Sequence, residues 1–277
     1  MPESSQSDIL LSAHLWVRYG DKPPVLRDVD LDIRRGEVLG LVGQSGSGKS
    51  TLAMAILGLL DKRQADVEGT VAFDGSDLLR LAESDLRALR GRRLTLVLQS
   101  PLLSLNPALK IRTQLKEAWR AHASGPKADC NAAIQAALQS VSLPSDKEFL
   151  RKYPSQMSVG QAQRVLIAMA VMHRPALLIA DEATSALDVI TQSEILALFR
   201  ELNRSTGMAI LYISHDLASV AGICDRIAIL HEGQIVELGT AEQVLTNPQH
   251  EYTQRLMAAM PKLPQPMGIA IAAQQGQ

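Results

Sequence analysis

The sequence predicts an α/β fold, in which buried strands alternate with helices. Three short apolar runs, at residues 38–42, 94–98 and 176–180, have the length and composition of strands buried on both faces of a sheet. Residues 161–173 and 190–203 instead repeat apolar residues at helical spacing. With 277 residues, of which 46% are hydrophobic, the chain can bury the core of one large domain, with or without an insertion.

Composition argues against several classes of function. The formal net charge is −1, so no basic excess indicates nucleic acid as a partner. Aromatic residues make up 3% of the chain, which leaves few rings on which bases could stack. Cys130 and Cys224 lie far apart without ligand-type neighbours, so we expect small core or surface residues rather than a disulfide or a metal site. The N-terminus is polar, unlike a signal peptide, and the longest apolar run, 165–172, is too short to span a bilayer. These features predict a cytosolic chain.

A glycine-rich loop between the first of these strands and a helix carries the strongest motif. It reads G-x-x-x-x-G-K-S, and glycines let a backbone wrap closely around phosphates that its N–H groups and the following helix dipole attract. Lys49 would reach the outer phosphates, and the Ser50 hydroxyl would ligate Mg²⁺. A chance Gly/Ser loop is the alternative, which the strand and helix context disfavours. The expected nucleotide contacts are Gly43, Gln44, Ser45, Gly46, Ser47, Gly48, Lys49, Ser50 and Thr51.

The elements on either side of this loop follow from their patterns. Strands are expected at 9–19 and 29–33, separated by a Gly-Asp-Lys-Pro-Pro turn, and at 69–73, where Asp74-Gly75 predicts a hairpin. The helix after the loop should present Leu52, Ala55, Ile56 and Leu59 on one face. Residues 77–93 predict one charged helix with a solvated arginine face formed by Arg87, Arg90, Arg92 and Arg93.

The second half of the chain predicts a helical insertion and a return to the sheet. Residues 111–150 are helical in pattern, with breaks at Ser124-Gly125-Pro126 and at Pro144. A strand at 209–214 and a hairpin over 227–238 follow the helices. The tail from Pro261 onward, rich in Pro, Gln, Gly and Ala, is expected to be mobile.

Polar side chains stand at the ends of the predicted buried strands. Gln99, the pair Asp181-Glu182 and His215 each follow such a strand, and ligands of α/β sheets bind at these ends. Asp181 fits a ligand of Mg²⁺, and Glu182 fits a base that polarises an attacking water. Taken alone, the acidic pair could equally cap a helix, and a single histidine is usually structural. The phosphate loop upstream favours chemistry for the acidic pair.

In these motifs the chain resembles the ATP-binding subunits of ABC transporters, over about residues 8–263. The matching elements are Walker A at 43–51, the Q-loop glutamine Gln99, Walker B with its catalytic glutamate at 177–182, the D-loop at 185–188 and the switch histidine His215. The resemblance implies an α/β, P-loop NTPase, ABC-type nucleotide-binding domain with a RecA-like core, an N-terminal antiparallel β subdomain and a helical signature subdomain. It places this domain at 8–250, its helical subdomain at about 108–173, and a C-terminal extension with a mobile tail at 251–277.

The resemblance also implies the cofactors, ATP and Mg²⁺, and a role for each site residue. Tyr19, by itself an ordinary strand-end aromatic, would stack on adenine. Glu182, His215 and Gln99 would be the catalytic residues: Glu182 would orient the water and His215 would sense the γ-phosphate. The metal would be arranged by Ser50, Gln99 and Asp181. The signature residues Ser158, Gly160 and Gln161 would contact ATP held by an opposite subunit.

Two segments narrow the resemblance to the oligopeptide, dipeptide and nickel importer group. They are residues 99–107 and the tail segment 247–253, which resembles that group's P-x-H-P-Y-T element with Glu251 in place of its proline. This implies an ATP-hydrolysing subunit that energises import of peptides, nickel or a related small solute. The alternatives are an ATPase accessory subunit of a phosphonate-degrading complex and a regulatory subunit that binds ATP without hydrolysing it. The intact Asp181-Glu182 pair argues against the second.

One departure bears on the partners. Where the family's signature reads L-S-G-G-Q, residues 157–161 read M-S-V-G-Q, and the branched side chain of Val159 would narrow the approach to the partner's nucleotide. One of the two composite sites would then be slow or silent, which favours a heterodimer with a related ATP-binding subunit over a homodimer. The resemblance also implies transmembrane permease subunits, docked on the Gln99 loop and the helical insertion, and indirectly an extracytoplasmic solute-binding protein. The chain would lie peripherally on the cytoplasmic face of the inner membrane.

Overall fold

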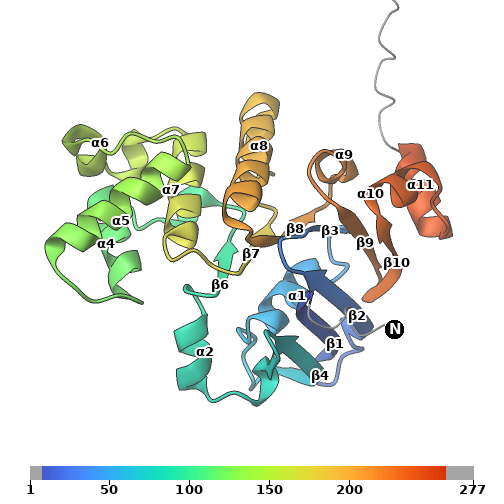
Figure 1. The fold of residues 1–277 in the computed structure, drawn as a ribbon. Helices are drawn as coiled ribbons and strands as arrows, with labels where there is room; N and C mark the ends of the chain where they lie inside the picture. Colours follow the sequence, from blue (N-terminus) through green and yellow to red (C-terminus); the bar gives the residue numbers. More distant parts are fainter. Residues whose placement is uncertain (1–7, 260–277) are drawn as a thin grey trace, which may run out of the picture.

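The computed structural model describes residues 8–259, and the predicted mobile tail from Pro261 lies outside them. Two sheets organise this part of the chain (Figure 1). The smaller is antiparallel, with strand order β2-β1-β4-β5. Its strands are β1 (Ile9–Tyr19), β2 (Leu26–Arg34), β4 (Ala65–Phe73) and β5 (Ser76–Asp77), and the predicted Asp74-Gly75 hairpin joins the last two.

The larger sheet has six strands in the order β10-β9-β3-β8-β7-β6 and is parallel except for its β10-β9 edge. Its strands are β3 (Val38–Val42), β6 (Leu94–Val97), β7 (Leu177–Asp181), β8 (Ala209–Ser214), β9 (Arg226–His231) and β10 (Gln234–Thr240). Because β3, β6, β7 and β8 run parallel, the residues that follow them gather at one edge of the sheet, where the predicted polar side chains lie.

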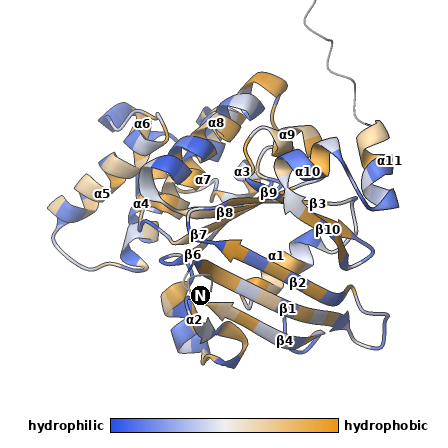
Figure 2. Ribbon diagram, turned by 45° about the vertical axis from the view of Figure 1, so that its right-hand side comes forward, coloured by the Kyte–Doolittle hydropathy of each residue, from blue (hydrophilic) through white to orange (hydrophobic). Residues whose placement is uncertain are grey.

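Apolar residues fill both faces of the larger sheet, which explains why its strands read as continuous apolar runs. Leu39 and Leu41 of β3 belong to a core shared with the antiparallel sheet and with α1 (Lys49–Ile56). Val38 and Val42, from the opposite face of the same strand, belong to the core shared with the helices on the other side. Figure 2 shows orange, hydrophobic stretches along the strands, interrupted by blue and grey ones in β1, β2 and β4 of the antiparallel sheet. The helix that follows the glycine-rich loop is therefore held between two sheets.

The helical insertion forms its own lobe beside the β6 edge of the sheet (Figure 1). It contains α4 (Ile111–Arg120), α5 (Lys127–Ser140), α6 (Lys147–Arg151) and α7 (Val159–Val171), so the predicted breaks at Gly125-Pro126 and Pro144 are confirmed. A short helix, α3 (Pro101–Ser104), connects β6 to this lobe. The long α8 (Val189–Thr206) then covers the same face of the sheet.

The C-terminal part of the described chain returns to the β9 and β10 side. After α9 (Leu217–Ala221) and the two edge strands come α10 (Ala241–Thr246) and α11 (Glu251–Ala259). Figure 1 shows both of these last helices, in orange and red, beside β9 and β10. Of the helices in residues 8–259, none combines the length and apolar character needed to cross a bilayer.

The single charged helix predicted over 77–93 is wrong. The segment forms a 3₁₀ turn at Leu78–Arg80 and then α2 (Glu83–Leu89), because Leu81 and Ala82 are extended. Arg90 does not join a solvated face: its guanidinium donates hydrogen bonds to the Leu57 and Gly58 carbonyls, each at 2.7 Å. Those carbonyls lie just after the last residue of α1, so Arg90 satisfies acceptors that the helix end leaves free. The helix after the loop also ends earlier than predicted, which leaves Leu59 47% exposed.

Candidate functional site

The glycine-rich loop packs tightly against the end of β9. A Cβ added at Gly43 would lie 2.3 Å from the Leu230 carbonyl oxygen, so only glycine fits there. Gly48 forms the N-cap of α1. Its φ of 106° is a backbone conformation that residues other than glycine rarely adopt. The loop thus presents its backbone at a helix N-terminus, which is the arrangement that binds phosphate.

Lys49 is held under this loop with 5% of its side chain exposed. Its Nζ donates hydrogen bonds to the Gly43 and Gln44 carbonyl oxygens, at 2.8 and 3.0 Å. Burial lowers the pKa of Lys49, although the Glu182 and Asp181 carboxylates oppose that change. A buried ammonium group of this kind gains most from an anion that reaches it, as a phosphate would.

A cleft of about 370 Å³ opens between the loop and the strand ends. Most of the predicted catalytic and phosphate-binding residues line it, together with Val25, which the sequence did not single out. The lining residues are Val25, Ser45, Gly46, Gly48, Lys49, Ser50, Thr51, Gln99, Asp181 and Glu182. The cleft therefore unites the loop with residues that lie far from it in the sequence, at 99 and 181–182.

Asp181 ends β7 and is 7% exposed. Within residues 8–259 its Oδ1 has no hydrogen-bond partner. Burial raises the pKa of Asp181, and the Glu182 carboxylate adds to this, whereas the Ser50 hydroxyl and the Lys49 ammonium oppose it. An unpaired buried carboxylate oxygen beside a hydroxyl is a hard-oxygen set that fits Mg²⁺. The helix-capping alternative fails, because the next helix, α8, is capped by Asp188.

Glu182 lies between Lys49 and His215. Its backbone has a φ of 48°, uncommon for a residue other than glycine, and its N–H donates to the Ile213 carbonyl at 3.0 Å. Its carboxylate oxygens lie 3.9 Å from Lys49 Nζ and 3.4 Å from His215 Nδ1. Half of the His215 side chain is exposed. Glu182 thus faces the cleft with a histidine beside it.

Other predicted residues lie away from this cleft. Tyr19, at the end of β1, is half-buried and is not part of the lining. Ser158 caps α7, where its hydroxyl accepts from the Gln161 N–H at 3.1 Å. Gly160 packs so closely that an added Cβ would lie 2.7 Å from Thr191 of α8. The signature residues therefore form a rigid helix start, but they do not face the chain's own nucleotide cleft.

Sequence reasoning missed one contact of the loop. The Gln44 N–H donates a hydrogen bond to the Tyr252 hydroxyl at 3.2 Å, and this tyrosine belongs to α11. The sequence did single out the segment 247–253, but only as a marker of a transporter group. A tyrosine in a short motif near the C-terminus was the available signal, although nothing in the pattern pointed to the loop.

Comparison with known proteins shows to which family the chain belongs. The family model described as "ABC transporter" matches residues 26–185, which is more than half of the chain. The chain belongs to the ABC transporter family. A second model, "Oligopeptide/dipeptide transporter, C-terminal region", matches residues 236–277 of this ABC protein. The ABC-type fold and the ATPase class predicted from the motifs are thereby confirmed.

Curated relatives cover most of this ABC chain. The oligopeptide transport ATP-binding protein OppD of Haemophilus influenzae is 42% identical over 253 residues, covering 90% of this chain and 78% of that protein. The dipeptide transport ATP-binding protein DppD of Bacillus subtilis is 39% identical over 249 residues, covering 90% and 74%. The predicted resemblance to the oligopeptide and dipeptide group is confirmed.

Solved structures show the same cassette. A dimeric post-hydrolysis state of the ATP-binding cassette MJ0796, bound to ADP and Pi, superposes with a TM-score of 0.72 at 26% identity, covering 83% of this ABC chain and 98% of that one. CbiO1 from Clostridium perfringens, part of an ABC transporter complex, gives a TM-score of 0.76 at 26% identity, covering 92% and 96%. Nucleotide binding is thus a property of the cassette fold that this chain shares.

Proposed function

We propose that this ABC subunit hydrolyses ATP in the cleft at Gly43–Thr51 to energise import of peptides or of a related small solute such as nickel. The observation that carries the site assignment is the position of Glu182, whose carboxylate lies within 4 Å of both Lys49 and His215 at the mouth of the phosphate loop. The names of the relatives, which are oligopeptide and dipeptide transport proteins, support the solute class. Both of these relatives are named as transport proteins, so they do not support the alternative of an accessory subunit in a phosphonate-degrading complex.

Each cleft residue has a distinct task in this proposal. Lys49 and the loop N–H groups hold the phosphates, and Tyr19 stacks on the adenine. Glu182 orients and polarises the attacking water, while His215, beside it, contacts the γ-phosphate. Gln99, which lines the cleft from the end of β6, joins the catalytic set.

Ser50, Gln99 and Asp181 would hold Mg²⁺, which fits the unpartnered Asp181 Oδ1. When bound, the metal would neutralise charge on the phosphate oxygens. The chain's own part is to keep the Asp181 carboxylate and the Ser50 hydroxyl fixed at the C-terminal end of β7 and the N-terminus of α1. Both elements are buried in the shared core, so these donors need little reorganisation.

We propose that Ser158, Gly160 and Gln161 serve ATP held by a second cassette. They lie outside this chain's cleft, and a cassette of the same fold is dimeric. Val159 is 37% exposed at the start of α7, and its side chain would face the partner's nucleotide. A heterodimer with a related subunit, in which one composite site is slow, follows from this position. Equal hydrolysis by both sites of the assembled transporter would overturn the asymmetry.

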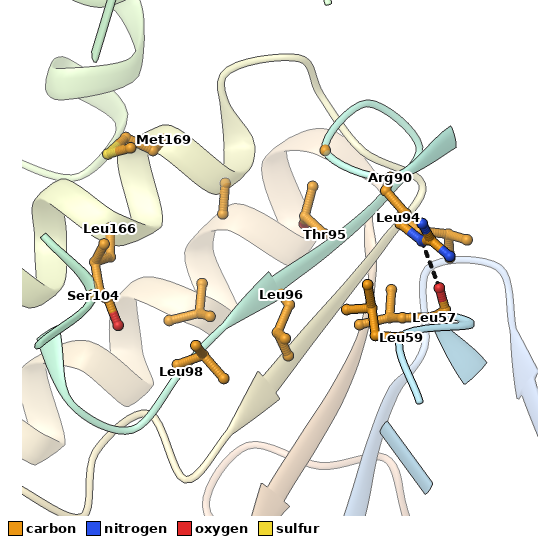
Figure 3. Close-up of a pocket in the computed structure, with 13 residues that line it drawn as sticks. Leu57, Leu59, Arg90, Leu94, Thr95, Leu96, Leu98, Ser104, Leu166 and Met169 are labelled. Carbon is orange, nitrogen blue, oxygen red and sulfur yellow. Dashed lines mark hydrogen bonds between the residues drawn. The ribbon is translucent and has the colours of Figure 1, made fainter. Parts of the chain in front are cut away.

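The permease docking surface is proposed at a groove beside the nucleotide cleft. This groove of about 280 Å³ runs along β6, and Figure 3 shows Leu166 and Met169 of α7 on one side of the strand and Leu57 and Leu59 on the other. Leu59 and Leu98 are 47% and 40% exposed there, and the buried Thr95 Oγ1 has no partner within residues 8–259. An amphipathic helix of a permease subunit would cover the leucines and could satisfy the threonine hydroxyl. Gln99 directly follows Leu98, so the groove is joined to the site.

The remaining assignments are also proposals. The ATP-binding domain extends over 8–250, its helical subdomain over about 108–173, and the C-terminal extension over 251–277. The subunit lies peripherally on the cytoplasmic face of the inner membrane, and a solute-binding protein acts through the permease. Purifying the chain from native membranes and identifying its companions tests this reading. Permease subunits and a second cassette are expected, whereas companions without membrane spans would contradict it.

A further inference from the structure

The last described helix contacts the phosphate loop through one buried side chain. Tyr252 of α11 is 5% exposed, and its hydroxyl oxygen accepts a hydrogen bond from the Gln44 N–H at 3.2 Å. The two residues are 208 positions apart in the sequence. A helix outside the ATP-binding family match, which spans residues 26–185, therefore contacts the loop directly.

The contact falls on a peptide group that is held from both ends. The Gly43 carbonyl oxygen accepts a hydrogen bond from Lys49 Nζ at 2.8 Å, and the N–H of the same peptide unit, on Gln44, donates to Tyr252. If Lys49 turns from these carbonyls toward phosphate, the first of these restraints is lost. The second comes from α11 and does not depend on the position of Lys49.

We propose that Tyr252 is a positioning residue for the phosphate loop, holding the Gly43-Gln44 peptide in place while Lys49 engages the nucleotide. The inference rests on the proposed assignment of ATP to this loop. It gives the C-terminal segment a role in nucleotide affinity, in addition to any role in transport. Preorganising a binding loop raises affinity because less conformational freedom is lost on binding.

The Tyr252 ring is itself fixed at the end of the sheet. It stacks on the imidazole of His231, the last residue of β9, with ring centroids 3.8 Å apart and planes 17° apart. The residue before it, Leu230, has the carbonyl that packs against Gly43. The end of β9 thus meets the start of the loop directly and supports the tyrosine that holds it.

The start of α11 is anchored by a carboxylate. Glu237 of β10 accepts hydrogen bonds from the backbone N–H groups of Gln249 and His250, at 2.8 and 3.1 Å. Partial burial would raise the pKa of Glu237, but favourable contacts, among them the hydrogen bonds from the Gln249 and His250 N–H groups, hold the pKa below its usual value. The Tyr252 N–H donates to His250 Nδ1 at 3.1 Å. The helix is therefore attached at its first turn, where Tyr252 lies.

A purely structural role is the competing explanation: the ring would fill space, and its hydroxyl would add nothing. Tyr252→Phe separates the two, because it keeps the stacked ring and removes only the acceptor of the Gln44 hydrogen bond. Tyr153→Phe is the matched control, since Tyr153 is 37% exposed in the helical lobe, away from the loop. Lys49→Ala tests the site assignment on which the inference depends.

The test uses the purified full chain and two measurements. The dissociation constant of a fluorescent ATP analogue with Mg²⁺ should rise by about two- to tenfold in Tyr252→Phe, the worth of one hydrogen bond. The rate of amide exchange in the 44–47 backbone, divided by the rate in β3, should increase. The ratio is used because a global loss of stability would speed exchange in both segments and must not count as support. Tyr153→Phe should match wild type in both.

Either of two results in Tyr252→Phe overturns the positioning role: a dissociation constant within twofold of wild type, or an unchanged exchange ratio. The site assignment fails separately. If Lys49→Ala binds the analogue as tightly as wild type, the loop is not the nucleotide site, whatever Tyr252 does. If Lys49→Ala loses binding and Tyr252→Phe behaves as wild type, only the positioning role is wrong.

Discussion

Glu182 Oε2 lies 3.4 Å from His215 Nδ1, although the two residues follow different strands of the sheet. β7 and β8 are parallel neighbours in a register that pairs Asp181 with Ile213, so the residues after them meet at one edge. A carboxylate aimed at the cleft with a histidine beside it can orient a water and sense the group that the water attacks.

His215→Ala should slow hydrolysis while ATP binding stays within about twofold of wild type. In the proposal the histidine, beside Glu182, contacts the γ-phosphate alone, whereas Lys49 and the loop N–H groups hold the phosphates. We expect a loss of about 10²-fold or less, the lower range for a positioned acid–base group. Phosphate release by the assembled transporter measures this. Loss of nucleotide affinity instead would place His215 in binding rather than in turnover.

As the pH rises, the affinity for ATP should begin to fall at a lower pH than it would if Lys49 were an ordinary, exposed lysine. Burial lowers the pKa of Lys49, and only the protonated ammonium attracts phosphate, so the charge is lost at a lower pH than for an exposed lysine, whose pKa is about 10.4. Bound phosphate will oppose part of this change. Lys49→Arg should move the decline to higher pH, since arginine stays protonated. A pH profile that is the same in both proteins contradicts the role of Lys49.

Asp181→Asn should raise the Mg²⁺ concentration needed for tight ATP binding. Asp181 Oδ1, which has no hydrogen-bond partner within residues 8–259, is the proposed hard ligand of the metal. The variant replaces the charged carboxylate with a neutral amide. Titrating Mg²⁺ at fixed nucleotide measures the change, and binding of metal-free ATP provides the comparison. Wild-type Mg²⁺ dependence in the variant would remove Asp181 from the metal site.

Leu59→Asp should break the association with the membrane subunits without changing ATP affinity. Leu59 lines the groove of Figure 3, is 47% exposed and lies beyond the last residue of α1, so a charge there should be tolerated by the fold. A buried unpaired carboxylate at the interface would cost several kcal/mol. Ala221→Asp, exposed in α9 and outside the helical insertion, is the matched control. Normal co-purification of Leu59→Asp with the permease would reject this groove as the docking surface.

Periodicity and motif order predicted the sheet and the strand-end residues, because buried parallel strands leave a strong apolar signal and their C-terminal ends share one edge. Local patterns did not show the contacts between distant segments. The Gln44–Tyr252 hydrogen bond and the Arg90 contacts with the residues after α1 depend on packing that no window of sequence contains. The break at Leu81-Ala82 was missed because a charged segment with helical spacing gives no direct sign of an extended pair.

Glu182→Gln tests the central claim most directly, because it replaces one carboxylate oxygen at the mouth of the phosphate loop with an amide nitrogen and keeps the length of the side chain. Phosphate release by the assembled transporter should fall by about 10²- to 10⁴-fold, while the dissociation constant for ATP stays near wild type. Glu201→Gln, an exposed carboxylate of α8, should leave both unchanged. Retained turnover in Glu182→Gln, at wild-type ATP affinity, would contradict the assignment of this site.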